Sequence, residues 1–541
     1  MAKGKTAIIQ QFIADGMDYM FGNVGTTEQG FLDELAGFDD LQYILGLQET
    51  VAAGIADGYA RATGRAALLQ LHSGVGLGNA VGMLYQAHRG HTPMVVIAGE
   101  AGVRYDAMDA QMAVDLVAMA RPVTKYATRV VDRGSVLRVL RRALKTAMTP
   151  PRGPVFVALP MDVLDEDNDE PVVPTSLPHT TAAPAPELVE RAAALLAGAR
   201  RPVVLMGDGV AASGAQCELT RVAEQLGADV WGVECSEVNM DARHPLYRGP
   251  LGHMFGAVST GAVRDADAVL VVGTYLFPEV FPELRSPFDD SARIVHIDLD
   301  ATAIAKNHPV SLGLVADPRS TLAELATAID RLLGPEDRAA ATGRLQTRAA
   351  ESGRSPAGES SLLAAFLRAL AGRVPEDVVV FDEGLTSSAL IQHHLPPRLP
   401  GHWFLTRGGS LGVGFPGAIG AKLAHPSKTV LGFTGDGGCM YTVQALATAA
   451  RYGIGAKFIV CNNGSYRLLN ENIEQYWAER DIPPHGFPDS FDLSRPRLGF
   501  VDLARGCGVD GVRLDRQADV DRAVELLLAD DAPFLVDVVT D

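Results

Sequence analysis

Short runs of valine, isoleucine and leucine alternate with longer helical patterns along the whole chain of 541 residues. The first third contains "LQYILGL", "AALLQL" and "PMVVIAGE", and the middle third contains "RPVVLMG", "DAVLVVG" and "ARIVHIDLD". In the last third, "TVLGF" and "AKFIVC" flank the helix-like "TVQALATAARYG". Apolar strands that alternate with helices are typical of parallel sheets covered on both faces. We therefore predict an α/β protein made of doubly wound parallel sheets.

Two stretches interrupt this alternation, near residues 166–187 and 334–361. The first is rich in proline and acidic residues, and the second in charged residues, alanine and glycine. Both are interpreted as linkers or surface crossings. They divide the chain into predicted domains at residues 1–170, 186–335 and 360–541, each of an ordinary domain size.

Composition narrows the classes of function. The formal net charge of −18 and the lack of a basic stretch argue against a nucleic-acid partner. The start "MAKGKTAIIQ" has no apolar signal core and no run is long enough to span a membrane, so we expect a cytoplasmic protein without a membrane partner. The five cysteines are far apart and form no CxxC pair, which supports neither a disulfide framework nor a zinc site.

Polar residues follow two predicted strands of the last third. Asp436 lies in "GFTGDGG" after one strand, and Asn463 lies in "CNNGSY" after the next. Because the carboxyl ends of parallel strands share one edge, these side chains are expected to lie close together. Their oxygens suit Mg²⁺ or Ca²⁺, and the glycines after Asp436 let an anion approach the start of a helix. The pattern indicates a metal bound to a phosphorylated ligand, although "GDG" alone also fits a plain turn, as at residues 207–209.

A second glycine cluster, "GVGFPG" at residues 412–417, matches the GxGxxG spacing of dinucleotide sites. The insertion "RGGSL" separates it from the strand-like "HWFLT", and Pro416 lies inside the motif. This interpretation also leaves Asn463 without a role. An NAD- or FAD-linked oxidoreductase therefore remains only a remote alternative.

The first third offers two candidates that are ambiguous when taken singly. Glu49 follows an apolar strand and opens a helix with many small residues, so it fits either a function or a helix cap. His72 ends the strand before "SGVGLGNAVG", and a lone histidine is more often structural than catalytic.

Together, these motifs resemble the thiamine diphosphate enzymes. Asp436 and Asn463 are separated by 463 − 436 = 27 residues, as in the metal and diphosphate signature of that family. "QE" before "AAGIADGYARATG", "GNAVG" and "RPVTKY" are also similar. The resemblance implies the pyruvate-oxidase-like architecture, with a pyrimidine-binding, a middle and a diphosphate-binding domain. "GNVGTTE", "LHSGVGLGNA" and "LGVGFPGAIGAKLAHP" look closest to the benzoylformate decarboxylase type.

The resemblance also assigns roles to residues. It implies that Mg²⁺ is bound by the side chains of Asp436 and Asn463 and by the backbone carbonyl of Ser465. Glu49 would bind the pyrimidine ring of the cofactor. The remaining cofactor-binding positions would be Thr386, Leu411, which props the bent cofactor, Gly437, Gly438 and Tyr466.

The same likeness implies that His72 occupies the position of a histidine that transfers protons. It also implies that Thr26 occupies the position of a serine that touches the substrate carboxylate. The implied reaction is non-oxidative decarboxylation of a 2-oxo acid, through a C2 carbanion and an enamine. The second histidine of that type is missing, because Val280 falls at its ungapped position in "GTYLFPEVFPELRS". A carboligase that forms a 2-hydroxy ketone, similar to acetohydroxyacid synthase, therefore stays open, as does, more remotely, a non-catalytic scaffold subunit. The likeness further implies a homodimer or homotetramer with active sites between chains.

Overall fold

The computed structural model describes residues 2–351 and 360–540. Within these residues, the strands form three large parallel sheets and one short antiparallel pair, β1 (Ala2–Lys3) with β8 (Asp167–Asn168). The predicted class, α/β with doubly wound parallel sheets, is confirmed. The chain forms two compact units: one joins the chain up to Pro178, the stretch ending at Leu395 and the chain from Thr406 onward, and the other holds the middle of the chain.

The N-terminal sheet of the first unit has the strand order β3-β2-β4-β5-β7-β6, so that β3 is an edge strand. Its strands are β2 (Tyr19–Gly22), β3 (Gln42–Leu45), β4 (Ala67–His72), β5 (Met94–Glu100), β6 (Tyr126–Arg129) and β7 (Pro154–Pro160). The helices around it are α1 (Gly4–Ala14), α2 (Gln29–Leu35), α3 (Glu49–Thr63), α4 (Ser73–Arg89), α5 (Leu116–Ala120), α6 (Val136–Met148) and α7 (Met161–Asp165). The expected strands "LQYILGL", "AALLQL" and "PMVVIAGE" correspond to β3, β4 and β5.

The C-terminal sheet of the same unit joins its strands in the order β15-β17-β18-β20-β19, all in parallel. These strands are β15 (Val379–Glu383), β17 (Val430–Gly435), β18 (Lys457–Asn462), β19 (Asp510–Leu514) and β20 (Phe534–Val539). The helices are α14 (Leu362–Ala371), α15 (Ser388–His394), α16 (Gly414–Ala424), α17 (Asp436–Thr442), α18 (Ala445–Tyr452), α19 (Arg467–Glu479), α20 (Phe500–Gly506) and α21 (Val520–Leu527). The expected "TVLGF" and "AKFIVC" strands are β17 and β18.

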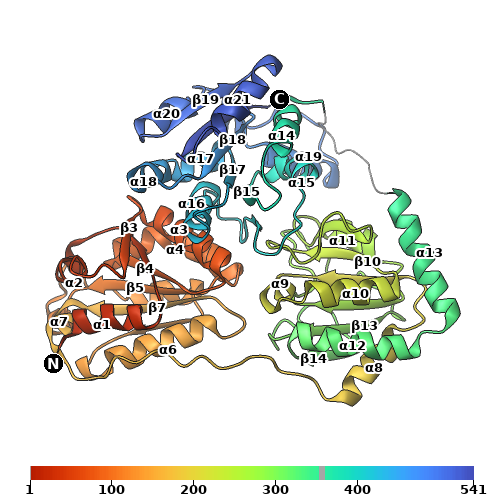
Figure 1. Ribbon diagram of the computed structural model, residues 1–541, viewed down its shortest axis with the longest axis horizontal. Coiled ribbons are helices and arrows are strands. Elements are labelled where there is room, and N and C mark those ends of the chain that lie inside the picture. Colours follow the sequence, from red (N-terminus) through yellow and green to blue (C-terminus); the bar gives the residue numbers. More distant parts are fainter. Residues whose placement is uncertain (1, 352–359, 541) are drawn as a thin grey trace. The chain divides into compact units, whose positions relative to one another are not determined.

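Helices α3 and α16 join the N-terminal and C-terminal parts of this unit, and they lie side by side in Figure 1. Their backbones approach so closely that a Cβ atom added at Gly58 would lie 2.1 Å from the carbonyl oxygen of Gly417. A Cβ added at Gly420 would likewise lie 2.1 Å from the carbonyl oxygen of Ile55. The small residues of the Glu49 helix thus serve a close contact within the chain, where only glycine fits.

The second unit contains the middle sheet, with the strand order β11-β10-β9-β12-β13-β14. Its strands are β9 (Pro202–Met206), β10 (Asp229–Val233), β11 (Tyr247–Leu251), β12 (Ala268–Val272), β13 (Arg293–Asp298) and β14 (Leu312–Val315), and β16 (Trp403–Leu405) clusters with this unit. Its helices are α8 (Pro186–Leu196), α9 (Gly209–Ser213), α10 (Gln216–Leu226), α11 (Gly256–Val263), α12 (Pro318–Leu332) and α13 (Pro335–Glu351).

Helix α13 corrects the expectation of a linker at 334–361, since residues 335–351 are helical. Alanine, arginine and glutamate favour a helix even without an apolar face, and Ala341 is its buried residue. Two arginines fix it to the unit: Arg344 donates to the carbonyls of Leu226 and Gly227, and Arg348 pairs with Asp229. Residues 352–359 of the expected linker lie outside the described residues.

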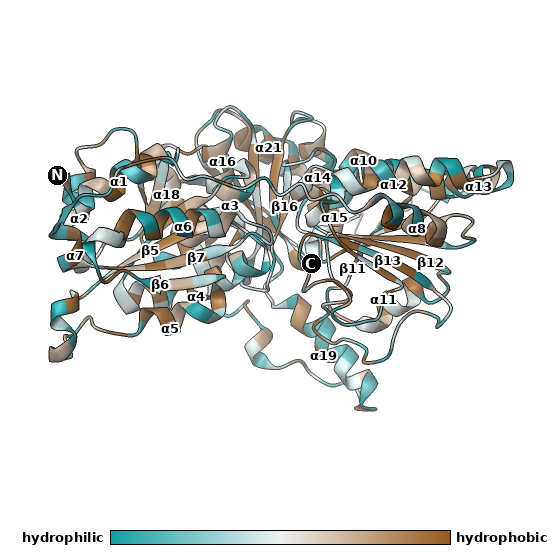
Figure 2. Ribbon diagram, turned by 90° about the horizontal axis from the view of Figure 1, so that it is seen from below, coloured by the Kyte–Doolittle hydropathy of each residue, from teal (hydrophilic) through white to brown (hydrophobic). Residues whose placement is uncertain are grey.

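The hydropathy colours of Figure 2 follow this layered construction. Strands such as β12 and β13 are largely apolar along their length, whereas α6 and α12 alternate apolar and polar residues. Buried parallel strands and amphipathic helices explain why the sequence alternated as it did. In the part of the chain that the structure describes, no helix combines the length and apolarity needed to cross a membrane.

Candidate active site

Asp436 and Asn463 lie at neighbouring strand ends, as the sequence predicted. Strands β17 and β18 pair in parallel with Gly435 opposite Cys461, so the turns after both strands meet at one edge of the sheet. Asp436 begins α17, and its Oδ2 accepts a hydrogen bond of 2.6 Å from the backbone N–H of Gly464. Its Oδ1 accepts 2.8 Å from the N–H of Gly437. The carboxylate therefore ties the two turns together.

The oxygen atoms at this edge match the ligands that a hard divalent cation prefers. Asp436 is 3% exposed, and burial raises the pKa of its carboxyl although backbone N–H groups oppose the shift. Asn463 Oδ1 accepts from both the N–H and the hydroxyl of Ser465, at 2.9 and 3.2 Å, which fixes the carboxamide in the loop. A bound cation would compensate the buried charge of Asp436, so the residues present fit a Mg²⁺ site.

The glycines after Asp436 are required by close packing. Gly437 and Gly438 are buried in the first turn of α17. A Cβ at Gly437 would lie 2.4 Å from the ring of Tyr466, and one at Gly438 would lie 2.6 Å from the hydroxyl of Thr434. Tyr466 is thus packed against the turn that carries the candidate metal ligand.

Glu383 is a residue of this region that the sequence analysis missed. It ends β15 and is 1% exposed, and it accepts hydrogen bonds from the N–H groups of Gly412 and Gly414 and from the Thr434 hydroxyl, at 2.5, 2.7 and 3.1 Å. Burial raises its pKa to about 7. Because Leu411 directly precedes Gly412, this carboxylate fixes the turn that presents Leu411. Glu383 could have been found from the sequence, because two consecutive acidic residues follow the apolar run "VVVF".

The turn that carries Thr386 is held by the neighbouring acid. Asp382 accepts hydrogen bonds from the N–H of Gly384 and the hydroxyl of Ser388, at 2.7 and 2.9 Å. Thr386 lies half-buried in the short 3₁₀ helix Leu385–Ser387. Asp382 and Glu383 at the end of β15 thus hold the turns that bear Thr386 and Leu411, and Asp436 holds its own turn to that of Asn463.

Glu49 begins α3, as expected, and is 5% exposed. Its carboxylate accepts hydrogen bonds from the side chains of Asn23 and Asn79, at 3.2 and 2.9 Å. The helix is capped by Gln48, whose side chain accepts from the N–H groups of Thr50 and Val51. Since another residue makes the cap, capping does not explain Glu49.

His72 is half-buried and contacts two buried residues that the sequence analysis did not single out, Thr27 and Glu28. Its Nδ1 lies 3.0 Å from Glu28 Oε2 and 3.1 Å from the Thr27 hydroxyl, which itself donates to Glu28 Oε1. Because the Thr27 proton is used on Glu28, the network assigns a proton to His72 Nδ1 and leaves Nε2 available. Burial raises the pKa of Glu28, and Thr27 and His72 oppose this shift. The predicted Thr26 is exposed beside this cluster.

Two glycines place His72 next to Glu49. A Cβ at Gly25 would lie 2.0 Å from the imidazole ring, so the ring lies directly on the backbone of that loop. A Cβ at Gly76 would lie 3.2 Å from Glu49 Oε1 and 3.4 Å from His72 Cβ, so Gly76 separates the two side chains. The motifs "GNVGTTE" and "LHSGVG" are therefore glycine-rich because they surround one imidazole and one carboxylate.

Three residues other than glycine adopt left-handed backbone conformations at the turns of the candidate site. They are Leu47, Ser73 and Leu385, with φ of 58°, 44° and 48°. Leu47 precedes Glu49 by two residues, Ser73 directly follows His72, and Leu385 directly precedes Thr386. Such conformations store about 1–3 kcal/mol each and persist where surrounding contacts fix them.

The hydrogen bonds divide the candidates into two groups. Glu49, His72, Glu28 and Thr27 belong to the N-terminal domain, whereas Asp436, Asn463 and Ser465 belong to the C-terminal one. Among the described residues, the partners of Glu49 are all from the N-terminal domain.

The remaining sequence candidates lie elsewhere. The glycines of "GVGFPG" are accounted for by packing, since a Cβ at Gly417 would lie 2.4 Å from the Phe381 ring. Val280 belongs to the second unit and is 59% exposed.

The fold and these strand-end clusters are those of an α/β protein with three large parallel sheets and candidate cofactor ligands at the sheet edges. Three thiamine pyrophosphate enzyme models match the chain: the N-terminal TPP binding domain at residues 2–119, the central domain at 189–325 and the C-terminal TPP binding domain at 383–538. Thiamine pyrophosphate is the same compound as thiamine diphosphate. The chain is also 32% identical to benzoylformate decarboxylase of Pseudomonas aeruginosa, over 97% of this chain and 96% of the relative. The chain belongs to the thiamine pyrophosphate enzyme family.

Further relatives include decarboxylases and carboligases. The acetolactate synthase large subunit of Haemophilus influenzae is 29% identical, over 94% of this chain and 89% of its own length. The solved structure of a thiamine diphosphate-dependent 4-hydroxybenzoylformate decarboxylase from Rhodococcus jostii RHA1 is similar with a TM-score of 0.86 and 29% identity, covering 100% of this chain and 99% of that one. The protein is a thiamine-pyrophosphate-dependent decarboxylase or carboligase.

Proposed function

We propose that this protein decarboxylates a 2-oxo acid without oxidation, using thiamine diphosphate and Mg²⁺. The observation that carries the proposal is the pair of half-buried His72 and buried Glu28 beside Glu49, because it supplies a proton-transfer group whose Nε2 atom is available. When bound, thiamine diphosphate supplies a nucleophilic carbon and an electron sink for the electron pair that remains when CO₂ leaves.

The side chains of the chain would divide the work between the two groups. Asp436, Asn463 and the Ser465 carbonyl would hold Mg²⁺, and the N–H groups of Gly437 and Gly438 would bind the diphosphate. The other contacts of the C-terminal part would come from Thr386, Leu411 and Tyr466.

In the N-terminal part, Glu49 would bind the pyrimidine ring through a carboxylate that Asn23 and Asn79 orient. Burial strengthens such a hydrogen bond, because water competes less for the carboxylate. His72 would accept and return a proton at Nε2 while its Nδ1–H keeps its hydrogen bond to Glu28, and the Thr26 hydroxyl would contact the substrate carboxylate.

Among the described residues, Glu49 and Asp436 share no hydrogen-bond partner. We further propose that each site combines the N-terminal part of one chain with the C-terminal part of another. A homodimer is then the smallest active form, and a homotetramer is compatible with it.

A carboligase that forms a 2-hydroxy ketone is the second candidate function. It is favoured by the exposed Val280, which offers no proton where the benzoylformate decarboxylase type has a second histidine. Slower protonation would leave more time for reaction with a second carbonyl compound.

The test is a panel of aryl and short aliphatic 2-oxo acids, incubated with thiamine diphosphate and Mg²⁺, with and without an acceptor aldehyde. We expect CO₂ and the matching aldehyde without acceptor, measured by mass spectrometry. Products that form only with an acceptor would show the carboligase instead. Absence of CO₂ from every acid of the panel would refute both.

A further inference from the structure

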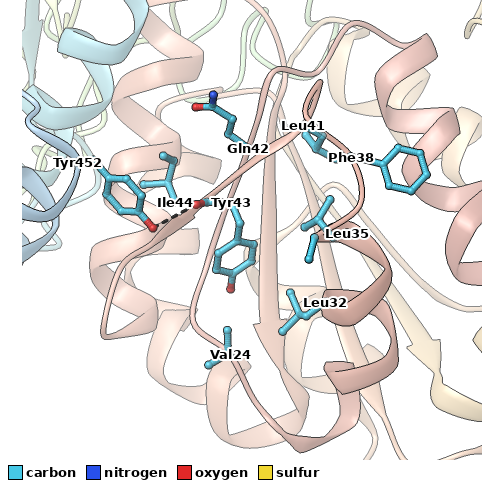
Figure 3. A pocket seen from close by; sticks show the side chains of 10 residues that line it. Val24, Leu32, Leu35, Phe38, Leu41, Gln42, Tyr43, Ile44 and Tyr452 are labelled. Carbon is cyan, nitrogen blue, oxygen red and sulfur yellow. Dashed lines mark hydrogen bonds between the residues drawn. The ribbon is translucent and has the colours of Figure 1, made fainter.

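The outer edge of strand β3 is covered by two hydroxyl groups of α18. The N–H of Leu45 donates to the Tyr452 hydroxyl at 3.0 Å, and this hydroxyl donates to the Tyr43 carbonyl at 3.1 Å. The Thr448 hydroxyl donates to the Leu45 carbonyl at 2.8 Å. Figure 3 shows Tyr452 reaching the strand beside a hollow that Val24 and Tyr43 also line.

These bonds replace a missing neighbouring strand. Alternate residues of a strand direct their backbone groups to opposite sides. On the inner side, the N–H of Gly46 donates to the Gly22 carbonyl of β2 at 2.9 Å. On the outer side, Tyr43 and Leu45 would face water if Thr448 and Tyr452 did not bind them. The end of β3 is therefore held from both sides.

The segment fixed in this way leads directly to Glu49. After Leu45 come Gly46, Leu47 in its left-handed conformation, and the helix cap Gln48. A Cβ at Gly46 would lie 2.8 Å from Ala52, so the turn is packed tightly against the first turns of α3. A strained turn keeps its geometry only when contacts hold both of its ends. The α3 end has its cap, and the β3 end has the two hydroxyls.

We propose that Thr448 and Tyr452 are positioning residues for Glu49. They act through the backbone of Leu45 and the turn that follows, and they touch neither substrate nor cofactor. Thr448 is 1% exposed, so its bond is shielded from water, whereas Tyr452 is 36% exposed and binds two backbone groups at once. The inference rests on the proposed function, because it assumes that Glu49 activates the cofactor.

The test compares the wild type with a double variant that combines Thr448→Val and Tyr452→Phe. This variant keeps the shape of both side chains and removes both hydroxyls. The variant is loaded with thiamine diphosphate and Mg²⁺ to the occupancy of the wild type, and exchange of the cofactor's C2 proton into D₂O is measured. We expect exchange to slow by about 10- to 100-fold, because a misplacement near 1 Å has effects of that size. Thr448→Ser, tested alone against Thr448→Val, should restore the rate because it keeps the hydroxyl.

A second measurement needs no cofactor. Amide hydrogen exchange of the free protein, followed by mass spectrometry, should accelerate by at least about tenfold in peptides covering residues 43–51 and stay unchanged elsewhere. The matched control is the double variant Thr327→Val and Tyr476→Phe, which removes a helix-surface hydroxyl in α12 and the hydroxyl of an exposed tyrosine in α19. It should change neither rate.

The Glu49→Gln variant distinguishes an error in the positioning role from an error in the proposed function. If it slows C2 exchange but the hydroxyl-free variant exchanges at the wild-type rate, or shows no local change in amide exchange, the positioning role is wrong. If Glu49→Gln itself leaves C2 exchange unchanged, the role of Glu49 in the proposed function is wrong and the positioning role falls with it.

Discussion

Replacing Gly58 by alanine tests the contact between α3 and α16 most directly. The added Cβ would lie 2.1 Å from the carbonyl oxygen and 2.6 Å from the Cα of Gly417, and both are backbone atoms that no side-chain rotation can move. Carbon and oxygen approach to about 3.3 Å in tight helix contacts. The two helices must therefore separate by roughly 1.2 Å, the difference between that distance and the 2.1 Å of the structure.

The separation has a price that can be estimated. Overpacking of this kind lowers the free energy of unfolding by about 1–3 kcal/mol, and the better helix propensity of alanine offsets up to about 1 kcal/mol of this loss. Because backbone meets backbone, we expect the upper part of that range, a net loss of about 2 kcal/mol in the free energy of unfolding. Glu49 begins the displaced helix, so turnover should also fall by roughly 10- to 100-fold.

The assay is urea unfolding followed by circular dichroism, together with CO₂ release from the preferred 2-oxo acid. Gly506→Ala is the matched control, because it lies in helix α20 of the same unit and an added Cβ would meet nothing within 4 Å. The control should be as stable as the wild type or slightly more stable. Equal urea midpoints for the two variants would refute the close packing of α3 on α16.

Four further predictions concern the site itself. Glu28→Gln should lower turnover by roughly 10- to 100-fold at unchanged cofactor occupancy, because a hydrogen bond to a charged group contributes about 1.5–3 kcal/mol; turnover within twofold of wild type would contradict the dyad. Asp436→Ala should lose bound thiamine diphosphate on desalting with Mg²⁺ present, and wild-type occupancy would show that the metal site is elsewhere. Refolding inactive His72→Ala and Asp436→Ala chains together should restore activity, measured against each refolded alone, and no gain in tagged hybrids would mean that the site lies within one chain or that His72 is not catalytic. For Glu383, burial raises the pKa from 4.5 to about 7, so its contribution to the free energy of unfolding is largest below pH 4.5 and declines as the pH rises to 7; the decline, about 3 kcal/mol at most, should be missing in Glu383→Gln when urea unfolding is compared across this range.

Much of the fold could be predicted because each strand signal is local. Buried parallel strands consist of continuous apolar runs, and the runs around Val204, Val271 and Phe458 are unambiguous. Asp436 and Asn463 could also be paired, because topology alone brings consecutive strand ends to one edge. Helix α13 was missed because it lies largely on the surface, where helix propensity rather than an apolar pattern decides the structure.

The missed site residues share a different cause. Glu28 and Glu383 act through hydrogen bonds to residues far away in the sequence, His72 and the backbone of Gly412. A single carboxylate in a motif does not reveal its acceptor role until the fold brings its donor near. The many small residues of the Glu49 helix could not be assigned to one contact from the sequence either, since a close helix contact within the chain and one between chains require the same small residues.

The contact between α3 and α16 also has a consequence for the order in which the protein is made. The two helices are separated by 414 − 63 = 351 residues, and Thr448 and Tyr452 follow later still. At translation rates of about 5–20 residues per second, α3 leaves the ribosome roughly 20–70 s before α16 exists. During this interval the glycine face of α3 and the outer edge of β3 have no cover from their own chain. Nascent chains of this protein should therefore depend on chaperones that shield a bare helix face and a free strand edge until the last third is synthesised.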